Sequence, residues 1–166
     1  MTEPVIVSRP GAGTTAIPLV FDSPHSGLEY PADMKPSLAT NILRRSEDTF
    51  VDQLFKGVDQ LGAVMVEATF PRCYIDPNRT TEDIEITALA DAWTGTVKPS
   101  IKTNRGTGLV WTKIGGVHPI YDRKLTAAEV QGRIDNYWAP YHETLAAEIE
   151  RLYADFGGIW HINCHS

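Results

Sequence analysis

The chain has 166 residues, of which 42% are hydrophobic and 22% are charged, and it carries a formal net charge of −6. This length and apolar content predict one globular domain over residues 1–166, and the acidic balance argues against a nucleic-acid-binding surface. We find no secretory signal or membrane-spanning segment and therefore expect a cytoplasmic protein without membrane partners. Cys73 and Cys164 lie far apart in the sequence, which predicts two reduced, packed thiols.

Strands alternate with helices along the first two thirds of the chain, a pattern typical of α/β folds. Residues 16–21 and 63–68 are expected to form strands, and residues 108–111 a third before a turn at Gly115-Gly116. Between the first two strands, apolar residues at helical spacing predict a helix that Ser46 caps and Gly62 ends. Residues 80–105 are expected to form loop and short helix.

The last third of the sequence predicts a long helix followed by a strand. Thr126 and Glu129 have the spacing of a capping box, and one apolar helical face continues from Val130 to Phe156 across Pro140. We therefore expect a helix kinked near Pro140, or two nearly collinear helices. After Gly157-Gly158, residues 159–162 are expected to form a buried strand that ends just before His165.

Two histidines, His25 and His165, each follow an apolar run that is expected to be a buried strand. Ligands of open α/β sheets gather at the carboxyl ends of the strands, so both imidazoles are predicted to face one site. Two histidines, a carboxylate and a water form a common catalytic zinc set. His161 is four residues from His165, roughly 13 Å along a regular strand, which is too far to share an ion. His118 and His142 are expected to be structural or solvent-facing.

Several motifs follow one another in the order of a known family. They are Ser23-Pro24-His25-Ser26-Gly27 with Tyr30-Pro31, Glu47 to Phe55, Pro71-Arg72-Cys73-Tyr74-Ile75-Asp76-Pro77-Asn78-Arg79, Ile120 to Leu125, and Asn163-Cys164-His165-Ser166. Together they resemble the N-formylglutamate amidohydrolases, a family similar to zinc carboxypeptidases and aspartoacylases. The resemblance implies a three-layer α/β/α sandwich around a mixed, mostly parallel sheet.

The same resemblance implies a mechanism and its residues. His25, His165 and a carboxylate would bind one Zn²⁺ ion, with Asp48 as the carboxylate and Glu29 or Asp52 as alternatives. Asp48 could also simply favour a helix N-terminus. Glu67 is a weak alternative general base, and its alternative reading is a solvated strand residue.

The arginines of the resemblance point to an acidic substrate. Arg72 would polarise the scissile carbonyl, and Asn78 with Arg79 would hold a substrate carboxylate. Asp76 and Arg79 could equally pin a turn. The implied reaction is zinc-dependent hydrolysis of N-formyl-L-glutamate, or a similar N-acyl acidic amino acid, to L-glutamate and formate in histidine degradation. A non-catalytic carboxylate-binding or assembly relative is the alternative, and the oligomeric state stays open.

The family's general base is implied to be a glutamate on a later strand, beyond the position of Ser166. We therefore expect these residues to be the N-terminal portion of a longer catalytic domain, incomplete at the C-terminus and impaired or inactive by itself.

Overall fold

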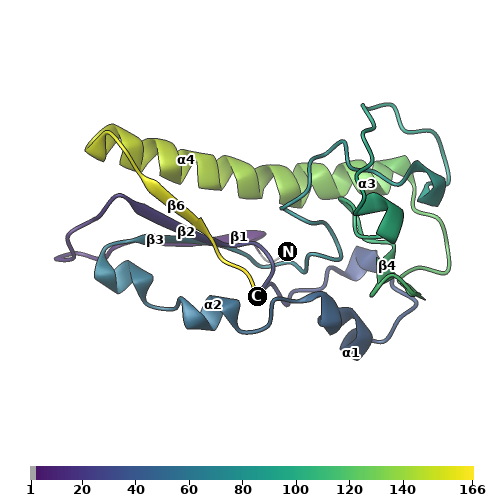
Figure 1. Ribbon diagram of the computed structural model, residues 1–166, viewed down its shortest axis with the longest axis horizontal. Helices are drawn as coiled ribbons and strands as arrows, with labels where there is room; N and C mark the ends of the chain where they lie inside the picture. The colour runs from purple at the N-terminus through teal and green to yellow at the C-terminus, as the bar shows by residue number, and fades with distance from the viewer. Residues whose placement is uncertain (1–2) are drawn as a thin grey trace.

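A four-stranded sheet lies at the centre of the computed structural model, which describes residues 3–166 (Figure 1). Its strands are β1 (Val5–Ser8), β2 (Leu19–Ser23), β3 (Val64–Ala68) and β6 (Trp160–Asn163), in the order β1-β3-β2-β6. β2 is parallel to both β3 and β6, whereas β1 is antiparallel to β3. The fold is therefore α/β, as the alternation of elements predicted, and its sheet is mixed and mostly parallel, as the family resemblance implied.

The long C-terminal helix is interrupted where the sequence predicted a kink. α3 (Ala127–Arg133) begins at the expected capping box and continues through a π-helical turn, η6 (Ile134–Trp138), into α4 (Ala139–Phe156). Pro140 lacks an N–H group and cannot donate to the preceding turn, so a locally widened helix accommodates it. α4 lies along the sheet and contacts β1, β2 and β3 (Figure 1).

A buried ion pair joins α4 to the segment after β1. Glu148 is 3% exposed and accepts hydrogen bonds from Arg9 at 2.5 and 2.9 Å and from Arg151 at 2.9 and 3.1 Å. Burial alone would raise the pKa of Glu148, but the two guanidinium groups outweigh it and lower the pKa below its usual value.

We expect the stabilising contribution of Glu148 to disappear in acid. Its folded pKa lies below its unfolded value, so the contribution is complete above about pH 4.5 and is lost as the pH falls below that value. Glu148→Gln should lower the free energy of unfolding by about 2 kcal/mol near neutral pH and by much less in acid. Urea unfolding at several pH values measures this, with Glu143→Gln on the exposed side of α4 as the control. A pH-independent effect of Glu148→Gln would contradict it.

The predicted helix between Ser46 and Gly62 is wrong. That stretch has two short helices instead, α2 (Val51–Leu54) and η3 (Val58–Leu61), and it is preceded by η1 (Ala32–Met34), α1 (Thr40–Leu43) and η2 (Arg44–Ser46). Phe50 and Gly57 adopt left-handed φ angles of 67° and 92°, which break the helix before and after α2. Ser46 does not cap; its hydroxyl donates to Leu43 O at 2.7 Å.

The connection between β3 and α3 is irregular, as predicted. It contains η4 (Ile86–Ala88) and η5 (Thr103–Arg105), and the buried Asp83 holds it by accepting hydrogen bonds from Ser100 and Thr103. The expected strand at 108–111 is wrong, because that segment has only one isolated bridge, Thr107 to Trp111. After this segment, β4 (Lys113–Ile114) and β5 (His118–Pro119) form an antiparallel hairpin around the predicted glycine turn.

The last strand differs from the prediction in its burial. β6 stands at the edge of the sheet, and Trp160 and Ile162 are 77% and 41% exposed, so it is not a buried strand. The strand expected at residues 16–21 is β2, which begins three residues later, at Leu19. β1 was not predicted. Both cysteines are free and buried, as expected. None of the helices in residues 3–166 has the length and apolar character needed to cross a membrane.

Candidate metal centre

The two histidines of the strand ends meet, as the sequence predicted. Asp22 of β2 lies opposite Asn163 of β6 in the parallel register, so the segments that follow both strands leave the sheet side by side. His25 Nδ1 lies 3.1 Å from His165 Nδ1, and the ring centroids are 4.7 Å apart. His25 is 1% exposed, whereas the side chain of His165 is 35% exposed and reaches the surface.

Asp48 completes a three-residue group that could hold a metal ion. Its backbone N–H donates to His25 O at 3.0 Å, which fixes the two loops together. Its Oδ2 lies 3.4 Å from His25 Nδ1 and 3.0 Å from His165 Nδ1. In a tetrahedral zinc site with bonds of about 2.0–2.1 Å, neighbouring donors are about 3.3 Å apart. The three donor atoms therefore already have the mutual spacing that such an ion requires.

The opposite nitrogen of each ring faces a hydrogen-bond acceptor. His25 Nε2 lies 2.8 Å from Asp76 Oδ1, and His165 Nε2 contacts Asn163 Oδ1. Because Asp76 is a carboxylate, it can accept the proton of His25 Nε2, and this is the tautomer that would leave Nδ1 free for a metal ion. His165 Nε2 lies beside both the Asn163 carbonyl oxygen and the Asn78 amide nitrogen, so these contacts orient its ring without selecting a tautomer.

The electrostatics keep both carboxylates of the site ionised. Burial alone would raise the pKa of Asp48, but hydrogen bonds from His25 and His165 and the charge of Arg72 lower it to about 2. Asp76 is fully buried, and its contacts with His25, Arg72 and Arg79 outweigh desolvation and hold its pKa well below the usual range. A ligand carboxylate that needs no deprotonation is favourable for cation binding at neutral pH.

Arg72 is the cation of this group. Its guanidinium donates to Asp48 Oδ1 at 3.3 Å and to Asp76 Oδ2 at 3.0 and 3.3 Å, and lies 5.1 Å from the centre of the Trp111 ring. The Trp111 indole also donates to Asp76 Oδ2 at 3.2 Å. Arg72 therefore lies between Asp48, the carboxylate of the candidate metal group, and Asp76, the carboxylate that contacts His25.

Asn78 and Arg79 lie at the same site. Asn78 Nδ2 donates to Asn163 Oδ1 at 2.9 Å and lies 2.7 Å from His165 Nε2. Arg79 Nη2 is 3.7 Å from Asp76 Oδ2, and its side chain is 17% exposed. Asp76 also accepts from the Asn78 backbone at 2.9 Å, so the turn is present, and the substrate-binding role of Asn78 and Arg79 stays a prediction.

Sequence reasoning missed the residue that holds β6 to β2. Asp22 is fully buried and accepts from Tyr141 at 2.5 Å and from Asn163 at 2.6 Å, and its Oδ1 lies 2.7 Å from His161 Nε2. A charged residue inside an apolar strand was the available signal, because a buried carboxylate requires partners. Asp22 thereby positions Asn163, which in turn orients His165.

The remaining candidates lie elsewhere. Glu29 lines a separate cavity, and Asp52 and Glu67 line a groove beside β3, so neither alternative ligand joins the two histidines. Burial, then the nearby Asp52 charge, raises the pKa of Glu67. His142 contacts Pro77 O at 2.9 Å, and His118 is exposed in β5.

Comparisons with known proteins point to one family. The model of the N-formylglutamate amidohydrolase family matches residues 17–166. N-formylglutamate deformylases of Pseudomonas aeruginosa and Pseudomonas putida are 27% and 28% identical over 144 residues, which cover 85% of this chain and 48% of theirs. The chain thus spans about half the length of these curated relatives.

Two solved structures extend the likeness to three dimensions. An N-formylglutamate amidohydrolase from Ralstonia eutropha JMP134 is 47% identical with a TM-score of 0.94, covering 99% of this chain and 58% of that one. A protein from Agrobacterium tumefaciens, 18% identical with a TM-score of 0.65, covers 98% of this chain and 56% of that one and shares the fold. With most of its length matched, this chain belongs to the N-formylglutamate amidohydrolase family.

Proposed function

We propose that this protein is the metal-binding part of a zinc-dependent amidohydrolase that cleaves N-formyl-L-glutamate to L-glutamate and formate. The observation that carries the proposal is the spacing of His25 Nδ1, Asp48 Oδ2 and His165 Nδ1, which lie 3.0–3.4 Å apart with Arg72 beside them. The names of the relatives support the reaction and the substrate.

The residues that would hold the ion are His25, Asp48 and His165. When bound, Zn²⁺ supplies a Lewis acid for the formyl carbonyl and lowers the pKa of water. Asp76 would keep His25 in the binding tautomer, Asn163 orients the His165 ring, and the low pKa of Asp48 keeps its carboxylate available. The protein would therefore orient the two imidazole ligands, and Asp48 would supply the one negative charge at the ion.

Arg72 is proposed as the catalytic residue that stabilises negative charge on the carbonyl oxygen during hydrolysis. Its guanidinium is held by two carboxylates and the Trp111 ring, so it is oriented before substrate arrives. Asn78 and Arg79 are proposed to bind a substrate carboxylate, because an amide and a planar guanidinium suit that group.

The structure supports no general base among its described carboxylates. Within residues 3–166, Asp48 is the one acid in the metal group, and Asp76 is engaged behind His25. The relatives are about twice as long, and we propose that residues 1–166 form one unit of a three-layer α/β/α hydrolase domain.

The test is formate release and substrate binding with and without Zn²⁺. We expect the zinc-loaded protein to bind N-formyl-L-glutamate more tightly than N-formyl-L-leucine, whose side chain lacks a carboxylate for Asn78 and Arg79. Formate release should be slower than that of a full-length family member assayed beside it, because no described carboxylate is placed as a base. Arg79→Met should remove the preference between the two substrates.

Two results would contradict the proposal. A folded protein that binds no Zn²⁺ and takes up N-formyl-L-glutamate equally well in chelator would favour the carboxylate-binding alternative. Equal affinity for both substrates would contradict the assignment of Asn78 and Arg79.

A further inference from the structure

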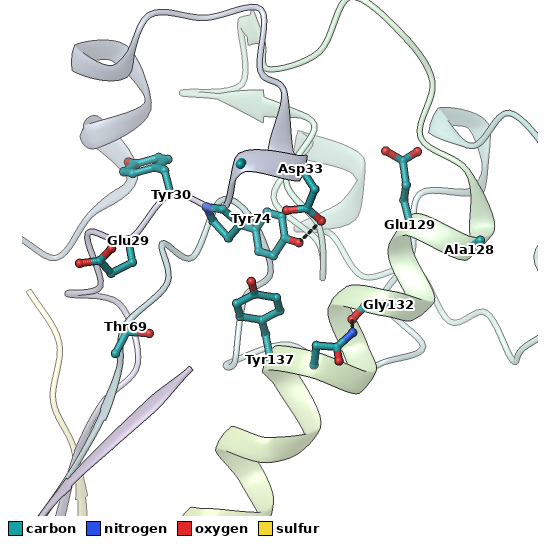
Figure 2. Close-up of a pocket in the computed structure, with 12 residues that line it drawn as sticks. Glu29, Tyr30, Asp33, Thr69, Tyr74, Ala128, Glu129, Gly132 and Tyr137 are labelled. Atoms are coloured by element: carbon teal, nitrogen blue, oxygen red, sulfur yellow. Dashed lines mark hydrogen bonds between the residues drawn. The ribbon is translucent and has the colours of Figure 1, made fainter. Parts of the chain in front are cut away.

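The cavity that Glu29 lines has a volume of about 710 Å³ and lies between the segment after His25 and the α3–η6 helix. Figure 2 shows Tyr74, Tyr137 and Asp33 near its middle, with Glu29 and Tyr30 on one side and Glu129 on the other. None of its lining residues belongs to the metal group. Its volume is within the range of about 300–1,000 Å³ that small-molecule sites occupy.

The side-chain hydrogen-bond donors of this cavity are almost all used inside the protein. The Tyr30 hydroxyl donates to Glu47 at 2.9 Å, and the Tyr74 hydroxyl donates to Asp33 at 2.7 Å. Thr69 donates to Glu3 O at 2.7 Å, and the Asn136 amide donates to Gly132 O at 2.6 Å. Among the described lining residues, the Tyr137 hydroxyl and the second N–H of the Asn136 amide are the side-chain donors that no protein acceptor takes.

The acceptors, in contrast, remain available. Glu29 and Asp33 present carboxylates, and the Asn136 carbonyl oxygen and the phenol oxygens add lone pairs. Glu129 is already paired with Arg123 at 2.6 Å, so Glu29 and Asp33 give the cavity its negative charge. No lysine, arginine or histidine stands among the described residues that line it. A ligand here must therefore bring both the positive charge and the N–H donors.

The rings add a preference for organic over inorganic cations. Tyr30 and Tyr137 are half-buried at the cavity, and Tyr137 is held edge-on to Tyr74 with ring centroids 5.0 Å apart. An alkylammonium group gains from aromatic rings and apolar walls, whereas a strongly hydrated metal ion does not. Ala32, Ala128 and Gly132 are small and leave room for a flexible chain.

We propose that this cavity binds a small aliphatic amine with two or more ammonium groups, placed between Glu29 and Asp33. The ammonium groups donate to the carboxylates and to the Asn136 carbonyl, and the methylene chain lies against the tyrosine rings. The site is separate from the metal centre and independent of the proposed hydrolysis.

Calorimetric titration of the protein with spermidine and with cadaverine at low salt tests the proposal. We expect saturable binding that weakens with added salt, and no binding of 1,5-pentanediol, which has the length of cadaverine without its charge. Glu29→Gln should weaken binding about two- to fivefold, and the Glu29→Gln/Asp33→Asn pair about tenfold or more. Glu143→Gln removes an exposed carboxylate elsewhere and should change nothing.

A space-filling variant separates this cavity from nonspecific charge attraction. A Cβ at Gly132 would meet nothing nearer than 3.9 Å, so Gly132→Leu is expected to fold and to fill the cavity. It should abolish spermidine binding, and Ala128→Leu provides the same test from another position. His165→Ala should leave binding unchanged. Binding that survives both filling variants, equal losses in Glu143→Gln, or displacement of spermidine by equimolar Mg²⁺ would overturn the proposal.

Discussion

Replacing His165 with alanine is expected to lower the affinity for Zn²⁺ at least about a hundredfold. Removing a residue that merely orients a metal ligand already lowers the metal affinity about 10- to 100-fold. Removing the ligand itself should lower the affinity further. His165 supplies one of three donor atoms, and its side chain is 35% exposed. The substitution therefore removes a ligand without leaving a cavity in the core, and the fold should survive.

Competition with a chromophoric zinc chelator measures this affinity directly. His118→Ala is the matched control, because His118 is exposed in β5 and belongs to another sheet. Elemental analysis of the purified proteins gives a second readout that does not depend on activity. If His165→Ala kept the zinc affinity of the unaltered protein, or if His118→Ala lost as much, the metal centre would be misassigned.

The meeting of His25 and His165 was predictable because it follows from topology. Each histidine comes just after a strand, and parallel neighbours end at the same edge of a sheet. Sequence periodicity could not show that β6 is an exposed edge strand, because apolar residues such as Trp160 occur in both settings. The convergence of the two strand ends was therefore predictable, and the burial of the last strand was not.

Asp48 illustrates the limit of pattern reading at the site. Residue type and motif made it one of three candidate carboxylates, but its position depends on the hydrogen bond from its backbone to His25 O. That contact joins loops 23 residues apart in a stretch where the predicted helix did not form. Left-handed backbone at Phe50 and Gly57 broke the apolar periodicity into short helices, and Leu54 and Leu61 are 78% and 76% exposed.

Asp76 was harder still, because one residue has two roles. Its place before Pro77 and Asn78 indicated a turn, and that turn is present. Its other contacts, with His25, Arg72 and Trp111, bring together three parts of the chain. Only the folded chain shows that the turn aspartate also contacts His25 Nε2, behind the group that could hold a metal ion.

Removing the charge of Arg72 is expected to destabilise the metal-free protein by about 3 kcal/mol or more, because a broken buried ion pair leaves charges unpaired. Arg72→Met keeps much of the apolar stem but leaves Asp48 and Asp76 without their guanidinium partner. Both carboxylates are buried, and their pKa values are low partly because of this charge. Arg72→Lys should lose less stability, since it keeps the charge but not the paired donors.

Zn²⁺ should reduce the loss of stability that Arg72→Met causes. This dependence on the metal distinguishes a role of the Arg72 charge from a role in packing. A divalent cation bound by His25, Asp48 and His165 replaces the positive charge beside Asp48, so the zinc-loaded variant regains part of its stability beyond the gain of the unaltered protein. Urea unfolding with and without Zn²⁺ gives both values, and Arg151→Met, which removes a 43% exposed guanidinium from α4, is the control. An identical loss with and without the metal would mean that Arg72 acts through packing against Trp111, and that its charge is not coupled to the metal group.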